Sequence, residues 1–139
     1  MKLGRTVRVP ETIAAALELV FGERIDQVRV IEYSLFARLH ACNHATTRRR
    51  RIYLLGSATD FFQNPWLMLH EYYHVLKQWE TGALTVPRYL LESMLRGYWR
   101  NRFEIEARGF ADVNRNRLLE ELSRGGRVAR SQPSSASRS

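Results

Sequence analysis

The sequence predicts an α+β domain in which a short sheet packs on a bundle of helices. Four segments repeat apolar residues at helical spacing, one shorter segment is rich in β-branched residues, and another is a short apolar run. Glycine, proline or asparagine stands at most boundaries between these segments. The chain has 139 residues, 45% of them hydrophobic, which suits one modest core. We therefore expect one domain over residues 1–123 and a flexible Arg/Ser-rich tail over residues 124–139.

The first half of the chain supplies one helix and two strands. A helix is expected over residues 10–21 and ends at Gly22. Residues 27–33 alternate partly and are rich in β-branched residues, which predicts a strand. Residues 34–47 are ambiguous between a short helix and a loop. The short apolar run at residues 52–55 predicts a second strand that pairs with the first.

The second half is expected to be helical. Asn64 and Pro65 are strong signals for a helix start, because asparagine caps the first turn and proline fits the first helical position. The helix then covers residues 66–80. Two further helices are expected over about residues 87–97 and 101–122, so the bundle contains the helix that follows Pro65.

Charge and composition limit the classes of partner. The net charge is +8, but half of it comes from four arginines in the acid-free tail, so nucleic acid is not the expected partner. Cys42 is the only cysteine, which excludes an intrachain disulfide and suits a reducing compartment. No signal peptide or membrane-spanning run is apparent, so we expect a cytoplasmic protein with no membrane partner. The sequence does not predict the oligomeric state.

The helix over residues 66–80 carries an HExxH motif on a polar stripe within a broad apolar arc. His70 and His74 lie one turn apart, so their imidazoles can converge on one zinc ion with N–Zn distances of about 2.0–2.1 Å. Zinc activates water, and the adjacent Glu71 could take the water's proton as general base. The simpler alternative is that this stripe, which also includes Lys77 and Gln78, is the wet face of an amphipathic helix.

A third zinc ligand is expected from the last helix. Glu104 and Glu106 lie about 30 residues after His74, and residues two apart on a helix point to different faces. At most one of them can therefore join the same ion. Glu104 shares its stripe with Ala107 and Ala111, small residues that would let the two helices approach closely. Both glutamates could equally be surface residues.

The runs HEYYHVLKQW and NRFEIEARGFA resemble the minimal gluzincin group. They resemble more closely an uncharacterised zincin-like family often found with extracellular contractile injection systems. The resemblance covers about residues 9–112 and implies a small zincin-like metallopeptidase domain that binds zinc. The segment from Glu104 to Ala111 is also similar to the third-ligand helix of ImmA/IrrE-type and CAAX-prenyl-protease-type enzymes, which implies Glu104 as the ligand and leaves Glu106 as the alternative.

One position departs from the resemblance. Related gluzincins often carry Asp or Asn four residues after the ligand glutamate, where it can support a zinc-binding histidine. Arg108 stands there in this chain, and Asp112, one turn further, could take over the supporting role. Weaker zinc binding or slow turnover would follow from the substitution.

Two functions are consistent with these patterns. The first is a zinc-dependent metallopeptidase, a hydrolase acting on a peptide or protein substrate, with zinc on His70, His74 and Glu104, water as fourth ligand, and Glu71 as general base. The alternative is a non-enzymatic zinc-bound interaction module of a larger assembly. Such a module would contact an acidic partner through the basic tail or the arginine run at residues 48–51.

Other residues carry weaker signals. His40, Cys42 and His44 form a small cluster, but their spacing fits no standard zinc finger and an ordinary loop is the favoured interpretation. Tyr89 and Tyr98 are candidates for polarising a substrate carbonyl or stabilising an oxyanion, although core or rim packing is the favoured role for both.

Overall fold

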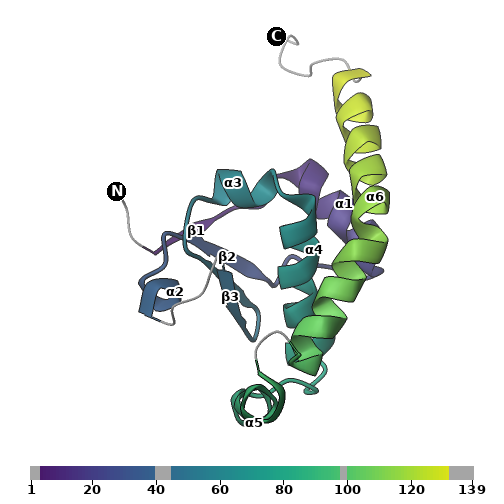
Figure 1. Ribbon diagram of the computed structural model, residues 1–139. Helices are drawn as coiled ribbons and strands as arrows, with labels where there is room; N and C mark the ends of the chain where they lie inside the picture. The colour runs from purple at the N-terminus through teal and green to yellow at the C-terminus, as the bar shows by residue number, and fades with distance from the viewer. Residues whose placement is uncertain (1–3, 40–44, 98–99, 132–139) are drawn as a thin grey trace.

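The protein has the α+β fold that the sequence predicts. The computed structural model describes residues 4–39, 45–97 and 100–131. A small sheet lies on one side, and a central helix, α4 (Pro65–Tyr73), stands between it and the long C-terminal helix α6 (Arg102–Ser131) (Figure 1). Helix α1 (Glu11–Phe21) packs beside α6 on the same side of the molecule. Within the described residues, no helix combines the length and apolar character needed to cross a bilayer.

The sheet has four strands in the order β1-β2-β4-β3. The predicted pairing of the two central strands is confirmed: they are parallel, with Val30 opposite Ile52, and both side chains are fully buried. The two outer strands pair antiparallel to them and were not predicted. The strands are β1 (Arg5–Val7), β2 (Arg29–Glu32), β3 (Ala45–Arg48) and β4 (Arg51–Leu54).

Several helices contact the sheet: α2 packs on β4, α3 on β2, and α4 and η1 on β3. Helix α2 occupies part of the segment that was ambiguous in the sequence, and the short helix α3 was not predicted. Ser57 caps α3, since its hydroxyl oxygen accepts from the backbone N–H of Asp60 at 3.1 Å. The helices are α1 (Glu11–Phe21), α2 (Leu35–Leu39), α3 (Ala58–Phe62), α4 (Pro65–Tyr73), η1 (His74–Trp79), α5 (Val86–Arg96) and α6 (Arg102–Ser131).

Helix α4 begins as predicted, because the Asn64 side chain accepts from the N–H of Leu67 at 3.1 Å and Pro65 occupies the first turn. It continues without a break into η1, a π-helical segment that starts at His74. Single π turns inside helices are rare and are frequent at functional sites. The wet-face interpretation of the polar stripe is wrong, since four of its five members are buried; they are His70, Glu71, His74 and Gln78.

Helix α6 is longer than predicted. It runs to Ser131 instead of ending near Leu122, so residues 124–131, assigned to the tail from sequence, are helical. The glycine pair at residues 125–126 lowers helix propensity by about 1 kcal/mol per residue. Packing against α1 overrides this cost: a Cβ placed on Gly125 would lie 3.8 Å from Thr12 Cβ, and Leu118 is fully buried between the helices and the core. Residues 132–139 lie outside the described part.

Candidate metal centre

Two packed helices bring three candidate ligands together. His70 and His74 belong to α4 and η1, and Glu104 lies in the first turn of α6. Ala107 and Ala111 on α6 are fully buried, as expected for small residues at a close contact with α4. The start of α6 is fixed by Asn101, whose Oδ1 accepts from the N–H of Phe103 at 2.9 Å. The position of Glu104 relative to the two histidines is therefore determined by the packing of α6 on α4 as well as by the hydrogen bonds of the Glu104 carboxylate.

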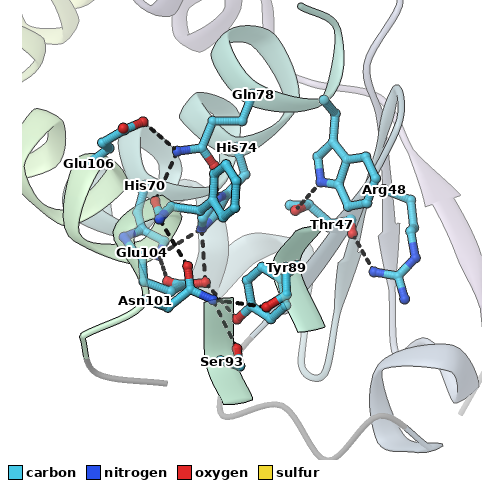
Figure 2. A network of polar contacts seen from close by, with 12 residues as sticks. Thr47, Arg48, His70, His74, Gln78, Tyr89, Ser93, Asn101, Glu104 and Glu106 are labelled. Carbon is cyan, nitrogen blue, oxygen red and sulfur yellow. Dashed lines mark hydrogen bonds and ion pairs between the residues drawn. The ribbon is translucent and has the colours of Figure 1, made fainter. Parts of the chain in front are cut away.

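The three side chains converge closely enough to share an ion. His70 Nε2 lies 3.1 Å from Glu104 Oε2, His74 Nε2 lies 3.3 Å from Glu104 Oε1, and the two Nε2 atoms are 3.3 Å apart (Figure 2). Nitrogen ligands about 2.0–2.1 Å from a tetrahedral zinc are separated by about 3.3 Å, which the two imidazole nitrogens match. The two histidines face different oxygens of the Glu104 carboxylate. One ligand atom from each side chain lies within 4.8 Å of the other two, so the three residues could hold a metal ion.

Burial and mutual charge set the protonation of the cluster. Burial alone would raise the pKa of Glu104, but hydrogen bonds to His70 and His74 hold it well below its usual range. Burial alone would lower the pKa of His74, but the hydrogen bond and charge of Glu104 raise it above its usual value. A proton on the His74 imidazole therefore occupies the lone pair that a metal ion would use.

Gln78 determines which nitrogen of His74 faces the ligands. Its Nε2 donates to two groups that can only accept, the carbonyl oxygen of Phe103 at 2.9 Å and Oε2 of Glu106 at 3.2 Å. Its Oε1 consequently faces His74 Nδ1 at 2.7 Å and accepts the Nδ1 proton. When the imidazole is neutral, its free lone pair lies on Nε2, which points toward His70 and Glu104.

His70 is supported differently. Its Nδ1 is buried and has no hydrogen-bond partner among the described residues. The Trp66 ring stacks on the imidazole with centroids 4.9 Å apart, and Trp66 Nε1 donates to Asp112 Oδ1 at 2.7 Å. Asp112 thus contacts the ring that stacks on His70, whereas the sequence suggested that Asp112 supports a histidine directly. Arg108 lies half-buried on α6 between Glu104 and Asp112.

The two remaining predicted site glutamates have different surroundings. Glu71 is buried beside His70, and its charge contributes to the raised pKa of His74, which places the carboxylate close to the cluster. Glu106 is exposed, and its carboxylate accepts from Gln78. The structure thus brings Glu104, and not the alternative Glu106, together with the histidines.

Tyr89 lies at the edge of the cluster but points at a ligand. Its hydroxyl donates to Glu104 Oε1 at 3.1 Å, and Asn101 ties the same helix, α5, to α6 by donating to Ser93 Oγ at 2.9 Å (Figure 2). In this arrangement the tyrosine orients the carboxylate, a role different from the oxyanion contact considered for it. Tyr98 lies outside the described residues.

The other candidate features do not join this cluster. The arginine run forms the tip of the β3–β4 hairpin, where Arg49 and Arg50 approach Glu80 at 3.9 and 3.5 Å and Arg48 lies over the Phe36 ring. The cluster of His40, Cys42 and His44 lies outside the described residues.

Comparison with known proteins gives no relative for this chain: no protein family, curated protein or solved structure matches it. The site therefore has to be interpreted from its own geometry. Sequence reasoning missed the roles of Gln78 and Trp66. The spacing of four residues on either side of the histidine pair, His74 to Gln78 and Trp66 to His70, is the signal that could have indicated both.

Proposed function

We propose that this chain is a zinc-dependent metallopeptidase of gluzincin type. Zinc would be held by His70 Nε2, His74 Nε2 and one carboxylate oxygen of Glu104. The observation that carries the proposal is the convergence of three buried side chains. The two imidazole Nε2 atoms are 3.3 Å apart, the separation of about 3.3 Å expected on a tetrahedral zinc, and each lies 3.1–3.3 Å from an oxygen of Glu104.

The number of ligands supports a catalytic ion over a structural one. Structural zinc sites are usually closed by four protein ligands, whereas catalytic sites keep one position for water. Among the described residues, no fourth His, Cys, Asp or Glu joins the group of His70, His74 and Glu104. A water molecule is the expected occupant of the fourth position.

The chain's own residues supply the proton transfer. Bound zinc would provide Lewis acidity and lower the pKa of a coordinated water toward about 7. Glu71 takes a proton from the water that attacks the peptide carbonyl and later delivers it to the leaving amine. Gln78 keeps the Nδ1 proton of His74 in place, and Tyr89 holds Glu104, so both ligands are oriented before the ion arrives.

The test combines metal analysis with peptide hydrolysis on the full chain. We expect purified protein to bind one zinc per chain and His70→Ala or Glu104→Gln to reduce the affinity strongly. Glu106→Gln is the matched control, because it changes the exposed neighbour two residues away and should retain zinc. Glu71→Gln should retain zinc and lose hydrolysis of a peptide library.

Two results would contradict the proposal in different ways. A wild-type chain that takes up no zinc after incubation with the ion and gel filtration would exclude the metal centre. A chain that binds one zinc but cleaves no peptide, with Glu71→Gln indistinguishable from wild type, would favour a non-enzymatic zinc-bound interaction module.

A further inference from the structure

Helix α5 is amphipathic, but its apolar side faces solvent. The exposed fractions are 56% for Leu90, 57% for Leu91, 84% for Met94 and 70% for Leu95, and no residue of the helix is buried. Their spacing of i, i+1, i+4 and i+5 places them on one side of the helix. These four residues form what we call the α5 apolar face. Clusters of exposed large apolar residues of this kind mark interaction sites.

The opposite, polar side of α5 holds the helix to the protein. Tyr89 donates to Glu104, Ser93 accepts from Asn101, and Glu92 Oε1 accepts from the N–H of Arg102 at 3.4 Å. Because the candidate metal centre lies on this inner side, a substrate bound there would not cover the α5 apolar face. Helix α5 lies at one end of the molecule (Figure 1).

The exposed charges of α5 and the residues just after it are positive. Arg88 and Arg96 on α5, followed by Arg100 and Arg102, are all exposed. Arg88 lies beside the α5 apolar face and donates to the carbonyl oxygens of Gly82 and Ala83, whereas Arg96 lies on the polar side, 3.2 Å from Glu92. Glu92 is the only acid in this stretch, and its side chain is 12% exposed. An exposed apolar stripe on a basic helix is the pattern of helices that lie in the interface of anionic membranes.

We propose that α5 docks the protein on an anionic lipid surface, with its apolar face inserted among the lipids and the neighbouring arginines on the headgroups. No membrane partner was expected from the sequence, because the chain has no apolar run long enough to cross a bilayer. A helix that lies in the lipid–water interface does not need such a run. Eleven residues extend only about 16 Å, roughly half of a hydrocarbon core of about 30 Å. The helix axis therefore lies along the surface.

A second copy of the chain fits this face less well. Pairing two α5 helices would bring both sets of arginines together without exposed acids to neutralise them. A lipid surface of negative charge is complementary to the arginines and accepts the apolar side chains at the same time.

The experiment is co-sedimentation of the full chain with phosphatidylcholine vesicles that contain either no phosphatidylglycerol or about 30 mol% of it. We expect binding to the anionic vesicles, with or without a chelator, and at least about tenfold weaker binding without the anionic lipid. Leu91→Ser/Met94→Ser should weaken binding to the anionic vesicles by at least about tenfold, because two large apolar groups no longer enter the interface. Val113→Ser changes a residue that is 81% exposed on α6 and should bind as wild type. Circular dichroism should show unchanged folding, since all three positions are exposed.

Several outcomes would overturn the proposal. One is equal binding by the double variant and wild type, which would assign the association to the arginines of the C-terminal segment. Absence of binding to anionic vesicles would also refute it. Concentration-dependent dimerisation in sedimentation velocity, lost in the double variant and accompanied by no vesicle binding, would identify a second copy as the occupant.

Discussion

Replacing Gln78 by leucine should weaken zinc binding without touching a ligand. The substitution is close in volume but removes the acceptor of the His74 Nδ1–H bond, 2.7 Å long, and the donor to the Phe103 carbonyl. Gln78 is fully buried, so no bulk water replaces these partners. Loss of a hydrogen-bonded partner to a metal-bound histidine typically lowers metal affinity by about 10–100-fold, and we expect a loss in this range.

The same substitution should also destabilise the metal-free fold. A buried group left without a partner costs about 1–3 kcal/mol, and His74 Nδ1 becomes such a group. The Phe103 oxygen loses the Gln78 donor but keeps its place in the hydrogen-bond ladder of α6. Leucine recovers part of the loss by apolar burial. We expect a net decrease of about 1–2 kcal/mol in the free energy of unfolding.

Competition with a chromophoric chelator measures the zinc affinity, and urea unfolding in the presence of a chelator measures the stability. Imidazole ¹⁵N spectra distinguish positioning from stability alone, because neutral His74 should carry its proton on Nδ1 in wild type and lose this preference in Gln78→Leu. Glu106→Gln removes only the exposed end of the network and serves as control. Zinc affinity within twofold of wild type, with an unchanged His74 tautomer, would refute the positioning role of Gln78.

Three further predictions concern stability and protonation. In the metal-free protein, Glu104 has a lowered pKa and stabilises the fold above pH 4.5, whereas His74 has a raised pKa and stabilises the fold below pH 6.5. Urea unfolding in the presence of a chelator should therefore show the largest stabilisation by this pair between pH 4.5 and pH 6.5. Zinc affinity should rise with pH, because His74 loses the proton that competes with the ion. Leu118→Ala should lower the free energy of unfolding by about 2–5 kcal/mol, because Leu118 is fully buried. The control Leu119→Ala changes a residue that is 38% exposed and should cost less than about 1 kcal/mol. Equal effects of the two variants in urea titrations would contradict the packing of α6 on α1. Gly22→Ala should cost about 1–2 kcal/mol in the same assay through backbone strain alone, because φ is +72° and the added Cβ meets nothing within 4 Å; an unchanged midpoint would contradict the left-handed cap.

The residue types near each boundary were sufficient to predict several helix ends and the two central strands. Gly22 ends α1 in the left-handed conformation, and Asn64 with Pro65 starts α4, as their residue types predict. The two central strands could be identified because one is rich in β-branched residues and the other is a short apolar run closed by Gly56. The helix spacing of His70 and His74, and the faces of Glu104 and Glu106, also follow from helical geometry alone.

The remaining features depend on contacts between distant segments. Strand β1 has three residues and is defined by its pairing with β2, more than 20 residues later in the chain. Strand β3 pairs with its sequence neighbour β4, but the turn at Arg49 and Arg50 lacks the glycine or asparagine that usually marks a hairpin. The extension of α6 past the glycine pair depends on α1 lying alongside. The π-helical turn at His74 and the orientation of the Gln78 amide require the backbone of α6 as a partner, so neither could be derived from the sequence of α4 and η1.

The composition of the interior argues for a bound ion on physical grounds. Removing an ionised carboxylate and two imidazoles from water costs several kcal/mol, and apolar residues of similar volume at such positions are often neutral or stabilising. Here Glu104, His70 and His74 are each at most 6% exposed. A further buried polar side chain, Gln78, orients His74 by a hydrogen bond. A metal-free fold would gain at least as much stability from apolar residues of similar volume at these positions. A divalent cation between the three ligand atoms offsets the desolvation cost directly, so the centre is the place where stability and proposed activity depend on the same ion.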